Sequence, residues 1–189
     1  MENHKKTIHL GIIGAGKVTT QPNRHIDSIR SLHDKDVEIT AIADITPGLA
    51  ADVAEEFHIP YSFEDYHDLL AMETIDAVTI NTPTFTHKQI ALDCIRAGKH
   101  VYVEKPITQT AEELVEVLAE ARKSNKVFLG GSNGLLQRQM RMFRQLVSSG
   151  RMGETYLMTI DRCSSRNQEY GMHSLSGKHG SGISSHSGS

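Results

Sequence analysis

The 189-residue chain has the composition of an ordinary soluble globular protein, with 38% hydrophobic and 23% charged residues, and its length suits one domain or one domain plus part of a second. A formal charge of −3, an isoelectric point near 6.4 and the lack of a Lys/Arg block argue against a nucleic-acid partner. No apolar stretch approaches the ~18 to 20 residues of a membrane helix, and two cysteines without a CxxC pair indicate a reducing, cytoplasmic location.

Short runs rich in Val and Ile alternate with helical segments, which is typical of a parallel α/β sheet. The expected strands cover residues 7–13, 37–43, 75–81, 100–104 and 126–130. The basic and then apolar start, MENHKKTIHLGII, leads directly into a glycine loop without a cleavage site, so we interpret it as the first strand and not as a secretion signal.

Capping residues mark where helices should begin. Thr46 and Pro47 predict a helix over 47–57, and Thr110 with Glu113 forms a capping box before a further helix. The first helix is the exception, because Pro22 would break a helix that began at the glycine loop. Either that helix starts beyond Pro22, or Pro22 lies in a distorted first turn.

Glycines mark where two further helices should stop. Gly98 follows an expected helix over 86–97, and Gly150 follows one over 136–149. Within the latter, the run RQMRMFR alternates basic and apolar residues, which favours one packed and one solvated face over a nucleic-acid surface.

The stretch GIIGAGKVTT (residues 11–20) fits two different phosphate-binding patterns. As GxxxxGK[ST] it would indicate an ATP- or GTP-dependent enzyme, but Val18 stands where that loop needs a hydroxyl for Mg²⁺. That interpretation also places Ile12 and Ile13 in a loop that must wrap phosphates, although both residues suit the buried end of a strand. The chemistry therefore argues against the nucleoside-triphosphate interpretation.

The same stretch fits a dinucleotide-binding turn better. Gly14 permits a tight turn after the strand, and Gly16 lets the backbone approach a pyrophosphate at the start of the next helix. Thr19 departs from the pattern, which normally has Gly or Ala there for close helix–strand packing. Asp44 ends the second strand, 25 residues after Thr19, where its carboxylate can accept hydrogen bonds from ribose hydroxyls. No Arg follows Asp44 at once, which favours NAD over NADP.

Two later motifs follow expected strands. Asn81-Thr82-Pro83-Thr84-Phe85-Thr86-His87 comes after IDAVTIN, and Glu104-Lys105-Pro106 ends AGKHVYVEKP. With the glycine turn and Asp44, this order of TPxxxH and EKP resembles the glucose-fructose oxidoreductase/inositol dehydrogenase/MocA family. The resemblance covers about residues 7 to 161 and includes GETYLMTIDR, which looks like the first strand of that family's second domain.

The resemblance implies roles for individual residues. Lys105 would contact substrate hydroxyls and the nicotinamide side as the catalytic residue, and Glu104 would help to seat the nicotinamide ribose. His87 is expected to contact a ligand directly; the alternative is that it only caps its helix or packs in the protein. Cofactor contacts are expected from thirteen residues and a metal site from none: Gly14, Ala15, Gly16, Lys17, Val18, Asp44, Asn81, Thr82, Pro83, His87, Glu104, Lys105 and Pro106. Other histidines lack ligand spacing and suit ordinary positions: His25, His33, His58 and His67.

The predicted architecture is a Rossmann-type, doubly wound parallel sheet in residues 1–130, followed by the truncated start of an α+β substrate and oligomerisation domain in 131–189. Residues 174–189 are rich in Ser and Gly and suit a flexible tail. Alternatively, this ending resembles the family's DxGxH approach, with His186 at the acidic position, Gly188 at the glycine and the catalytic histidine just after Ser189. Either interpretation makes the chain an incomplete, inactive fragment.

The leading functional hypothesis is an NAD(P)-dependent oxidoreductase that transfers a hydride between a nicotinamide cofactor and a CH–OH group of a sugar, inositol or similar polyol. A full-length parent is expected to form a homo-oligomer, with no nucleic-acid or membrane partner. The alternative is a dinucleotide-binding regulator or scaffold that never turns over substrate.

Overall fold

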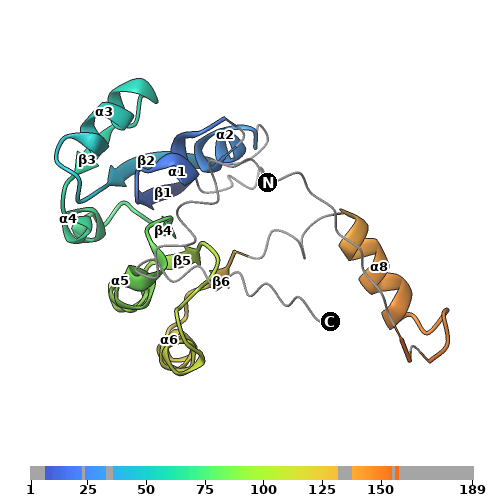
Figure 1. The fold of residues 1–189 in the computed structure, drawn as a ribbon. Helices are drawn as coiled ribbons and strands as arrows, with labels where there is room; N and C mark the ends of the chain where they lie inside the picture. The colour runs from blue at the N-terminus through green and yellow to red at the C-terminus, as the bar shows by residue number, and fades with distance from the viewer. Residues whose placement is uncertain (1–6, 23, 33–35, 132–137, 155, 158–189) are drawn as a thin grey trace, which may run out of the picture. The chain divides into compact units, whose positions relative to one another are not determined.

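Figure 1 shows the protein as a computed structural model that describes residues 7–22, 24–32, 36–131, 138–154, 156 and 157. The chain divides after Gly131 into two units, and each is described by itself.

Six strands form one sheet in the first unit, and every neighbouring pair is parallel. They are β1 (Ile8–Ile13), β2 (Val37–Ala43), β3 (Tyr61–Phe63), β4 (Ala77–Ile80), β5 (His100–Val103) and β6 (Phe128–Gly130). Their order is β3-β2-β1-β4-β5-β6, so the chain moves outward from β1 and then crosses back to β4. This is the Rossmann order, and it confirms the predicted fold class.

Helices cover both faces of this sheet (Figure 1). They are α1 (Lys17–Thr20), α2 (His25–Arg30), α3 (Leu49–Glu56), α4 (Tyr66–Ala71), α5 (Thr84–Arg96) and α6 (Ala111–Lys123). Successive strand residues point to opposite faces. Ile12 therefore packs in one core cluster with residues of α2 and α3, whereas Ile13 packs in the other with residues of α4, α5 and α6. Ile12 and Ile13 are 0% and 2% exposed, as the strand interpretation of GIIGAGKVTT requires.

The segment after β1 contains two short helices where one was expected. α1 is a single turn that ends at Thr20, and α2 begins at His25, with Pro22 between them. The missing N–H of Pro22 interrupts the helical ladder, so the helix forms on both sides of the proline.

The predicted cap at Thr46 and Pro47 is wrong. α3 begins at Leu49 after Gly48, whose φ is +78°, and the Thr46 N–H instead donates to Asp44 Oδ1 at 2.9 Å. A left-handed Gly48 cannot belong to a right-handed helix, so residues 46–49 form a turn, in which the Leu49 N–H donates to the Thr46 carbonyl at 3.1 Å, and α3 begins after it. The strand β3 and the helix α4 were not predicted, because both are short.

Other punctuation is confirmed. The Glu113 N–H donates to Thr110 Oγ1 at 3.3 Å, while the Glu113 carboxylate accepts from the Gln109 N–H at 3.0 Å. This carboxylate reaches one residue before the cap, in place of the cap's own N–H. Gly98 and Gly150 follow the ends of their helices with φ of +72° and +70°.

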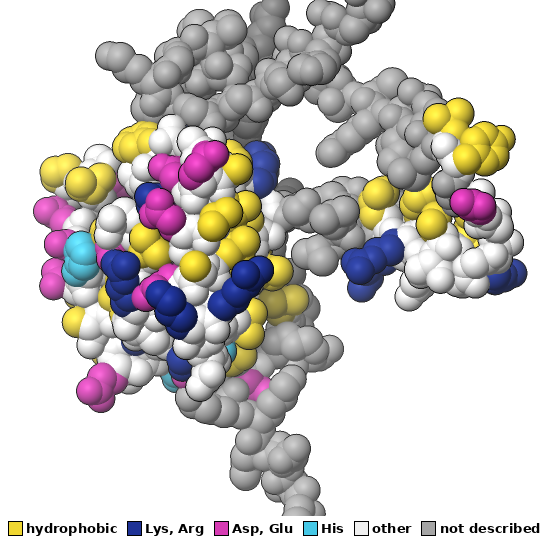
Figure 2. Space-filling view, turned by 90° about the horizontal axis from the view of Figure 1, so that it is seen from below, with side chains coloured by type: hydrophobic (Ala, Val, Ile, Leu, Met, Phe, Trp, Pro, Cys, Tyr) yellow, Lys and Arg dark blue, Asp and Glu magenta, His cyan; other side chains and the backbone are white. Residues whose placement is uncertain are grey.

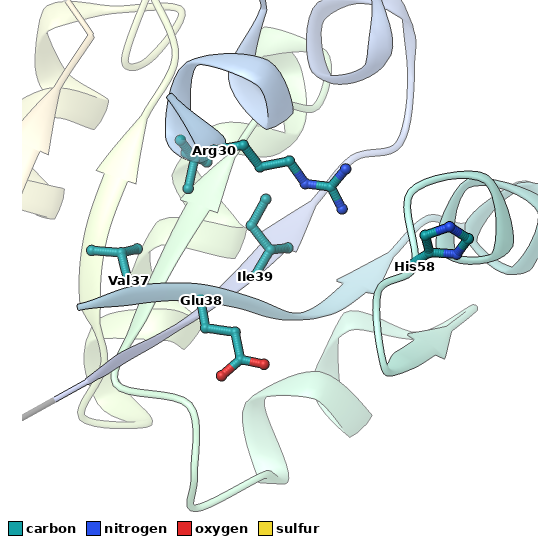
Figure 3. Close-up of a pocket in the computed structure, with 6 residues that line it drawn as sticks. Arg30, Val37, Glu38, Ile39 and His58 are labelled. Carbon is teal, nitrogen blue, oxygen red and sulfur yellow. The ribbon is translucent and has the colours of Figure 1, made fainter. Parts of the chain in front are cut away.

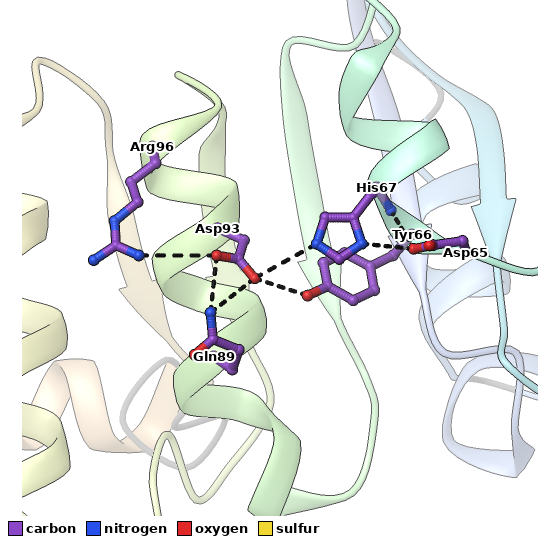
Figure 4. Close-up of polar contacts among 6 residues, drawn as sticks. All are labelled: Asp65, Tyr66, His67, Gln89, Asp93 and Arg96. Atoms are coloured by element: carbon purple, nitrogen blue, oxygen red, sulfur yellow. Dashed lines mark hydrogen bonds and ion pairs between the residues drawn. The ribbon is translucent and has the colours of Figure 1, made fainter.

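A polar cluster joins α4 to α5 (Figure 4). Tyr66 donates to Asp93 Oδ2 at 2.8 Å, and the His67 ring lies between Asp65 and Asp93. Gln89 also donates to Asp93, and its distances to the two carboxylate oxygens are 2.9 and 3.0 Å. Burial and the neighbouring Asp93 carboxylate raise the pKa of Tyr66, which keeps its phenol a donor at any ordinary pH. The cluster anchors the crossover that follows β3.

Charged side chains of both signs lie interspersed on the face shown in Figure 2. Among the described residues, ion pairs join neighbouring helices, such as Lys88 Nζ on α5 with Glu116 Oε2 on α6 at 2.7 Å. Among the described helices, none is both long and apolar enough to cross a membrane.

The second unit is described mainly by α8 (Arg138–Ser148). Its half-buried residues are Met140, Phe143 and Val147, spaced by three and four, while its arginines are exposed. This is the apolar stripe that the sequence pattern predicts.

Candidate functional site

The turn after β1 is built around Gly14. Its φ is +102°, and a Cβ there would lie 2.9 Å from the backbone carbon of Asn81. Only glycine allows both this conformation and this approach of the β1 turn to the β4 loop. The Gly14 N–H donates to the Ala43 carbonyl at 2.8 Å, which ties the turn to the end of β2 as well.

The open part of the turn begins two residues after Gly14. Gly16, Lys17 and Val18 are exposed, and a Cβ at Gly16 would meet no atom within 4 Å. The glycine at this position is therefore not required by packing inside the described protein. It leaves room for a group that approaches the backbone from outside.

Thr19 takes the place of the third glycine and is completely buried. Its hydroxyl donates to the Gly14 carbonyl at 2.5 Å and accepts from the Asn81 amide at 3.0 Å. The Asn81 side-chain oxygen in turn accepts from Thr79 Oγ1 at 2.8 Å. This chain of hydrogen bonds joins α1, the glycine turn and the end of β4, where a glycine would leave only a close backbone contact.

Asp44 follows β2 and faces the same turn. Its Oδ2 accepts from the Ala15 N–H at 2.8 Å, and its Oδ1 accepts from the Thr46 N–H at 2.9 Å. Both carboxylate oxygens are thereby fixed in direction beside the glycine turn. Each oxygen keeps further lone pairs, so the carboxylate can still accept from a ligand hydroxyl.

The loop after β4 lies beside the turn and is held by its own side chains. The Asn81 N–H donates to the Ile13 carbonyl at 2.8 Å, and Thr86 Oγ1 contacts Thr82 Oγ1 at 2.8 Å. Pro83 is exposed and directly precedes α5. The main chain of this loop therefore runs alongside the end of β1.

His87 is 1% exposed and lies between two loops. Its Nε2 is 2.7 Å from the Thr82 carbonyl oxygen, and its Nδ1 is 2.8 Å from the Pro106 carbonyl oxygen. A carbonyl oxygen only accepts, so both contacts are hydrogen bonds when both ring nitrogens carry hydrogen. The ring joins the loop after β4 to the loop after β5, and it points into the protein.

The loop after β5 carries a buried acid and an exposed base. Glu104 is 9% exposed, and its N–H donates to the Ile80 carbonyl at 2.9 Å. Its Oε1 lies 2.9 Å from His25 Nε2, and its Oε2 accepts from the Lys105 N–H at 2.9 Å. Lys105 and Pro106 are exposed. The Glu104 carboxylate is therefore buried and held at both oxygens, whereas the Lys105 side chain is exposed.

The electrostatics of Glu104 follow from these contacts. Burial raises the pKa of the carboxyl group, but the hydrogen bonds from His25 and the Lys105 N–H lower it by more, and the net pKa lies below the ordinary value of 4.5. Burial, followed by the Glu104 charge, raises the pKa of Tyr102. The site thus contains a fixed anion beside a neutral phenol.

A surface hollow of about 200 Å³ lies elsewhere (Figure 3). It is bordered by the end of α2, the start of β2 and the turn after α3, through Ile29, Arg30, Val37, Glu38, Ile39 and His58. It therefore lies at the opposite end of β2 from Asp44. Ligands of open α/β sheets bind at the carboxyl ends of the strands, so this hollow is not the candidate site.

The structure brings the predicted residues together at one edge. The segments 14–18, 81–83 and 104–106 follow the adjacent strands β1, β4 and β5, and Asp44 follows β2. Sequence reasoning missed His25, which was assigned to an ordinary position, because nothing in the spacing links it to Glu104, 79 residues away. His186 and Gly188 lie outside the described residues, as does most of the strand expected within GETYLMTIDR.

The residues at this edge fit a dinucleotide, because the exposed backbone at Gly16, the carboxylate of Asp44 and the crossover between β1 and β4 meet there. Among known proteins, the chain resembles the uncharacterized oxidoreductase YrbE of Bacillus subtilis, with 32% identity over 155 residues, which cover 82% of this chain and 44% of the relative. It is also 24% identical over 153 residues to the myo-inositol 2-dehydrogenase of Thermotoga maritima, covering 81% of this chain and 44% of that enzyme.

The chain is also similar to a solved structure. The putative myo-inositol dehydrogenase of Sinorhizobium meliloti matches with a TM-score of 0.67 and 28% identity, covering 78% of this chain and 43% of that one. The chain thus spans less than half the length of these proteins. The oxidoreductase family with an NAD-binding Rossmann fold matches residues 8–132. The chain therefore belongs to the glucose-fructose oxidoreductase/inositol dehydrogenase/MocA family of NAD-binding oxidoreductases.

Proposed function

We propose that the protein is an NAD(P)-dependent oxidoreductase that transfers a hydride between a nicotinamide cofactor and a CH–OH carbon of a sugar, inositol or similar polyol. One observation carries this proposal: the glycine turn, the Thr82-Pro83 loop and the Glu104-Lys105 loop end adjacent strands at one edge of the sheet. The names of the Thermotoga maritima and Sinorhizobium meliloti relatives support inositol or a related polyol as the substrate class.

The cofactor would lie across the carboxyl ends of β1 and β4. Gly16, Lys17 and Val18 would contact the pyrophosphate through the exposed turn, and Asp44 would accept from the ribose hydroxyls. A 2′-phosphate would meet the Asp44 carboxylate, and the next side chains bring no arginine, so NAD is favoured over NADP.

Asn81 and His87 are buried, and their side chains bind other protein groups instead of pointing to the cofactor. The Asn81 side-chain amide is hydrogen-bonded to Thr19 and Thr79, and each nitrogen of the His87 ring contacts a backbone carbonyl oxygen. In this proposal both residues act through the loops whose backbone they fix, and the main chain of Thr82 and Pro83 faces the cofactor. Glu104 would help to seat the nicotinamide ribose.

The cofactor, when bound, supplies the hydride acceptor or donor. Lys105 is the residue proposed for the proton. Its exposed side chain lies just after the end of β5, where it can hold a substrate hydroxyl and exchange a proton with the substrate oxygen as the carbon is oxidised or reduced.

Because the chain spans less than half the length of its relatives, we also propose that residues 131–189 begin a second domain. That domain would complete the substrate pocket and the contacts between subunits. By itself the 189-residue chain would bind cofactor without turning over substrate.

The test is an activity assay on the protein expressed from its gene, including any continuation of the reading frame beyond Ser189. NAD⁺ and a panel of polyols are supplied, and reduced nicotinamide is followed by its absorbance. The proposal expects turnover with at least one polyol, reduced about 100-fold or more in Lys105→Met because a positioned acid–base group contributes that much. Cofactor binding without turnover across the panel would instead identify a regulator or scaffold.

A further inference from the structure

His25 contacts the candidate site from an unexpected direction. It is the first residue of α2, and its side chain is 18% exposed. Its Nε2 lies 2.9 Å from Glu104 Oε1, and its ring meets the Tyr102 ring edge-on, with the centroids 5.9 Å apart. His25, which follows the break in the helix at Pro22, therefore lies beside the end of β5.

Glu104 passes this contact on to Lys105. One carboxylate oxygen is held by His25, and the other accepts from the Lys105 N–H. A carboxylate held at both oxygens cannot rotate freely, and the peptide that leads into Lys105 is fixed to it. The Glu104 N–H is bound to the Ile80 carbonyl, so the strand end on the other side is fixed too. Of the groups at this strand end, the exposed Lys105 side chain is the one that these contacts leave able to move.

We propose that His25 is a positioning residue: by holding the Glu104 carboxylate, it sets the direction in which Lys105 leaves β5 and the place where Glu104 meets the cofactor. The inference rests on the proposed oxidoreductase function. It goes beyond it, because no motif of the sequence includes His25.

The surrounding charges determine how a pH profile reports on this contact. At the end of β5 they are Glu104 and Lys105, with Tyr102 beside them. The other elements packed on α2 bring Lys17 from α1 and, from β2, Glu38, with Asp44 just after it; on α2 itself are Asp27 and Arg30, with Arg24 just before it. The hydrogen bond at 2.9 Å makes Glu104 the group through which the His25 ring acts on the site.

Removal of the donor changes the titration of Glu104 in a known direction. Burial raises the pKa of this carboxyl group, and the His25 hydrogen bond opposes that rise. In His25→Leu the opposition is lost, so the protonation midpoint of Glu104 moves up. His25→Gln keeps an N–H donor on a side chain of similar reach, so its midpoint should lie between those of the His25→Leu variant and the wild type.

The experiment uses the 189-residue chain and two readouts. The first is the pH titration of the Glu104 carboxyl carbon by NMR, and the second is NADH affinity by fluorescence as a function of pH. His25→Leu is expected to weaken NADH binding roughly tenfold or more, the scale of one lost hydrogen bond to a charged group, with loss of affinity starting at a higher pH than in wild type. His25→Gln should recover most of the affinity.

A matched control is His67→Leu, which makes the same change on α4 at a side chain that is 60% exposed. It should leave both readouts unchanged. If His25→Leu fails to fold by circular dichroism, Glu104→Gln tests the same link, and His25→Gln combined with Glu104→Gln should cost no more affinity than Glu104→Gln alone.

The possible failures are distinct. Wild-type protein that binds no dinucleotide would refute the proposed function. Wild-type protein that binds NADH, with the same affinity and pH profile in His25→Leu, would overturn the positioning role alone. A shifted Glu104 midpoint with unchanged NADH affinity would also overturn it, because the contact would then be merely structural.

Discussion

Replacing Thr19 tests whether a buried hydroxyl has taken over the work of the missing third glycine. Thr19→Val removes the hydroxyl at nearly constant volume. The Gly14 carbonyl then loses a donor and the Asn81 amide loses an acceptor, in a region where Thr19 is fully buried. Among the described residues, no buried side-chain N or O atom lacks a partner in the wild type, so the substitution would create such a defect.

The expected cost can be built from these contacts. A buried polar group left without its partner costs about 1–3 kcal/mol, so Thr19→Val should lower the free energy of unfolding by about 2–4 kcal/mol. Thr19→Gly also loses a buried methyl group, worth about 0.8 kcal/mol, and places glycine in a helical turn, at about 1 kcal/mol. Thr19→Ser keeps the hydroxyl and loses only the methyl group, so it should cost about 1 kcal/mol.

Urea unfolding followed by far-UV circular dichroism measures these differences. Thr20→Val is the matched control, because the Thr20 hydroxyl is 3.4 Å from the Gly16 carbonyl and lies at a less buried position; its effect should stay within about 0.5 kcal/mol. If Thr19→Gly, which restores the usual fingerprint, were as stable as the wild type or more so, the reasoning would be refuted.

Three other predictions concern single sites. Gly14→Ala should lower the free energy of unfolding by about 2–4 kcal/mol, because the φ of Gly14 is +102° and an added Cβ would meet Asn81. Gly16→Ala should be as stable as the wild type in the same urea assay, but it should lose affinity for NADH. In calorimetric titrations, Asp44→Ala should weaken NAD⁺ binding roughly tenfold and reduce the ratio of the affinity for NAD⁺ to that for NADP⁺. An unchanged ratio would mean that Asp44 does not contact the ribose. Burial raises the pKa of the Cys94 thiol, so iodoacetamide should label Cys94 at least about tenfold more slowly in native than in urea-unfolded protein, as mass spectrometry of its peptide would show; equal rates would contradict the buried position.

The core of the fold was predictable because parallel strands buried on both faces have a strong pattern. Val37–Ala43 agrees residue for residue with the expected strand, and Gly98 and Gly150 end their helices as expected. Short elements were not predictable. Tyr61–Phe63 has three residues and is largely exposed, so no periodicity marks it.

The candidate site was predictable where backbone geometry requires a residue type, as at Gly14. It was not predictable where a side chain from a distant segment completes it. Asp44 fits the fingerprint, but the left-handed Gly48 nearby moves the start of α3 past the position that local capping rules favoured. His25 reaches Glu104 because Pro22 splits the first helix and sets the start of α2 near the end of β5, which is a tertiary consequence that no local pattern contains.

The most direct test of the account is isothermal titration of NAD⁺, NADH, NADP⁺ and NADPH into the folded 189-residue chain. We predict saturable binding of one dinucleotide per chain, tighter for NAD(H) than for NADP(H), and lost in Gly16→Ala while the fold is retained. A folded chain that gives no binding heat with any of the four, at temperatures chosen to exclude a zero enthalpy, would contradict it.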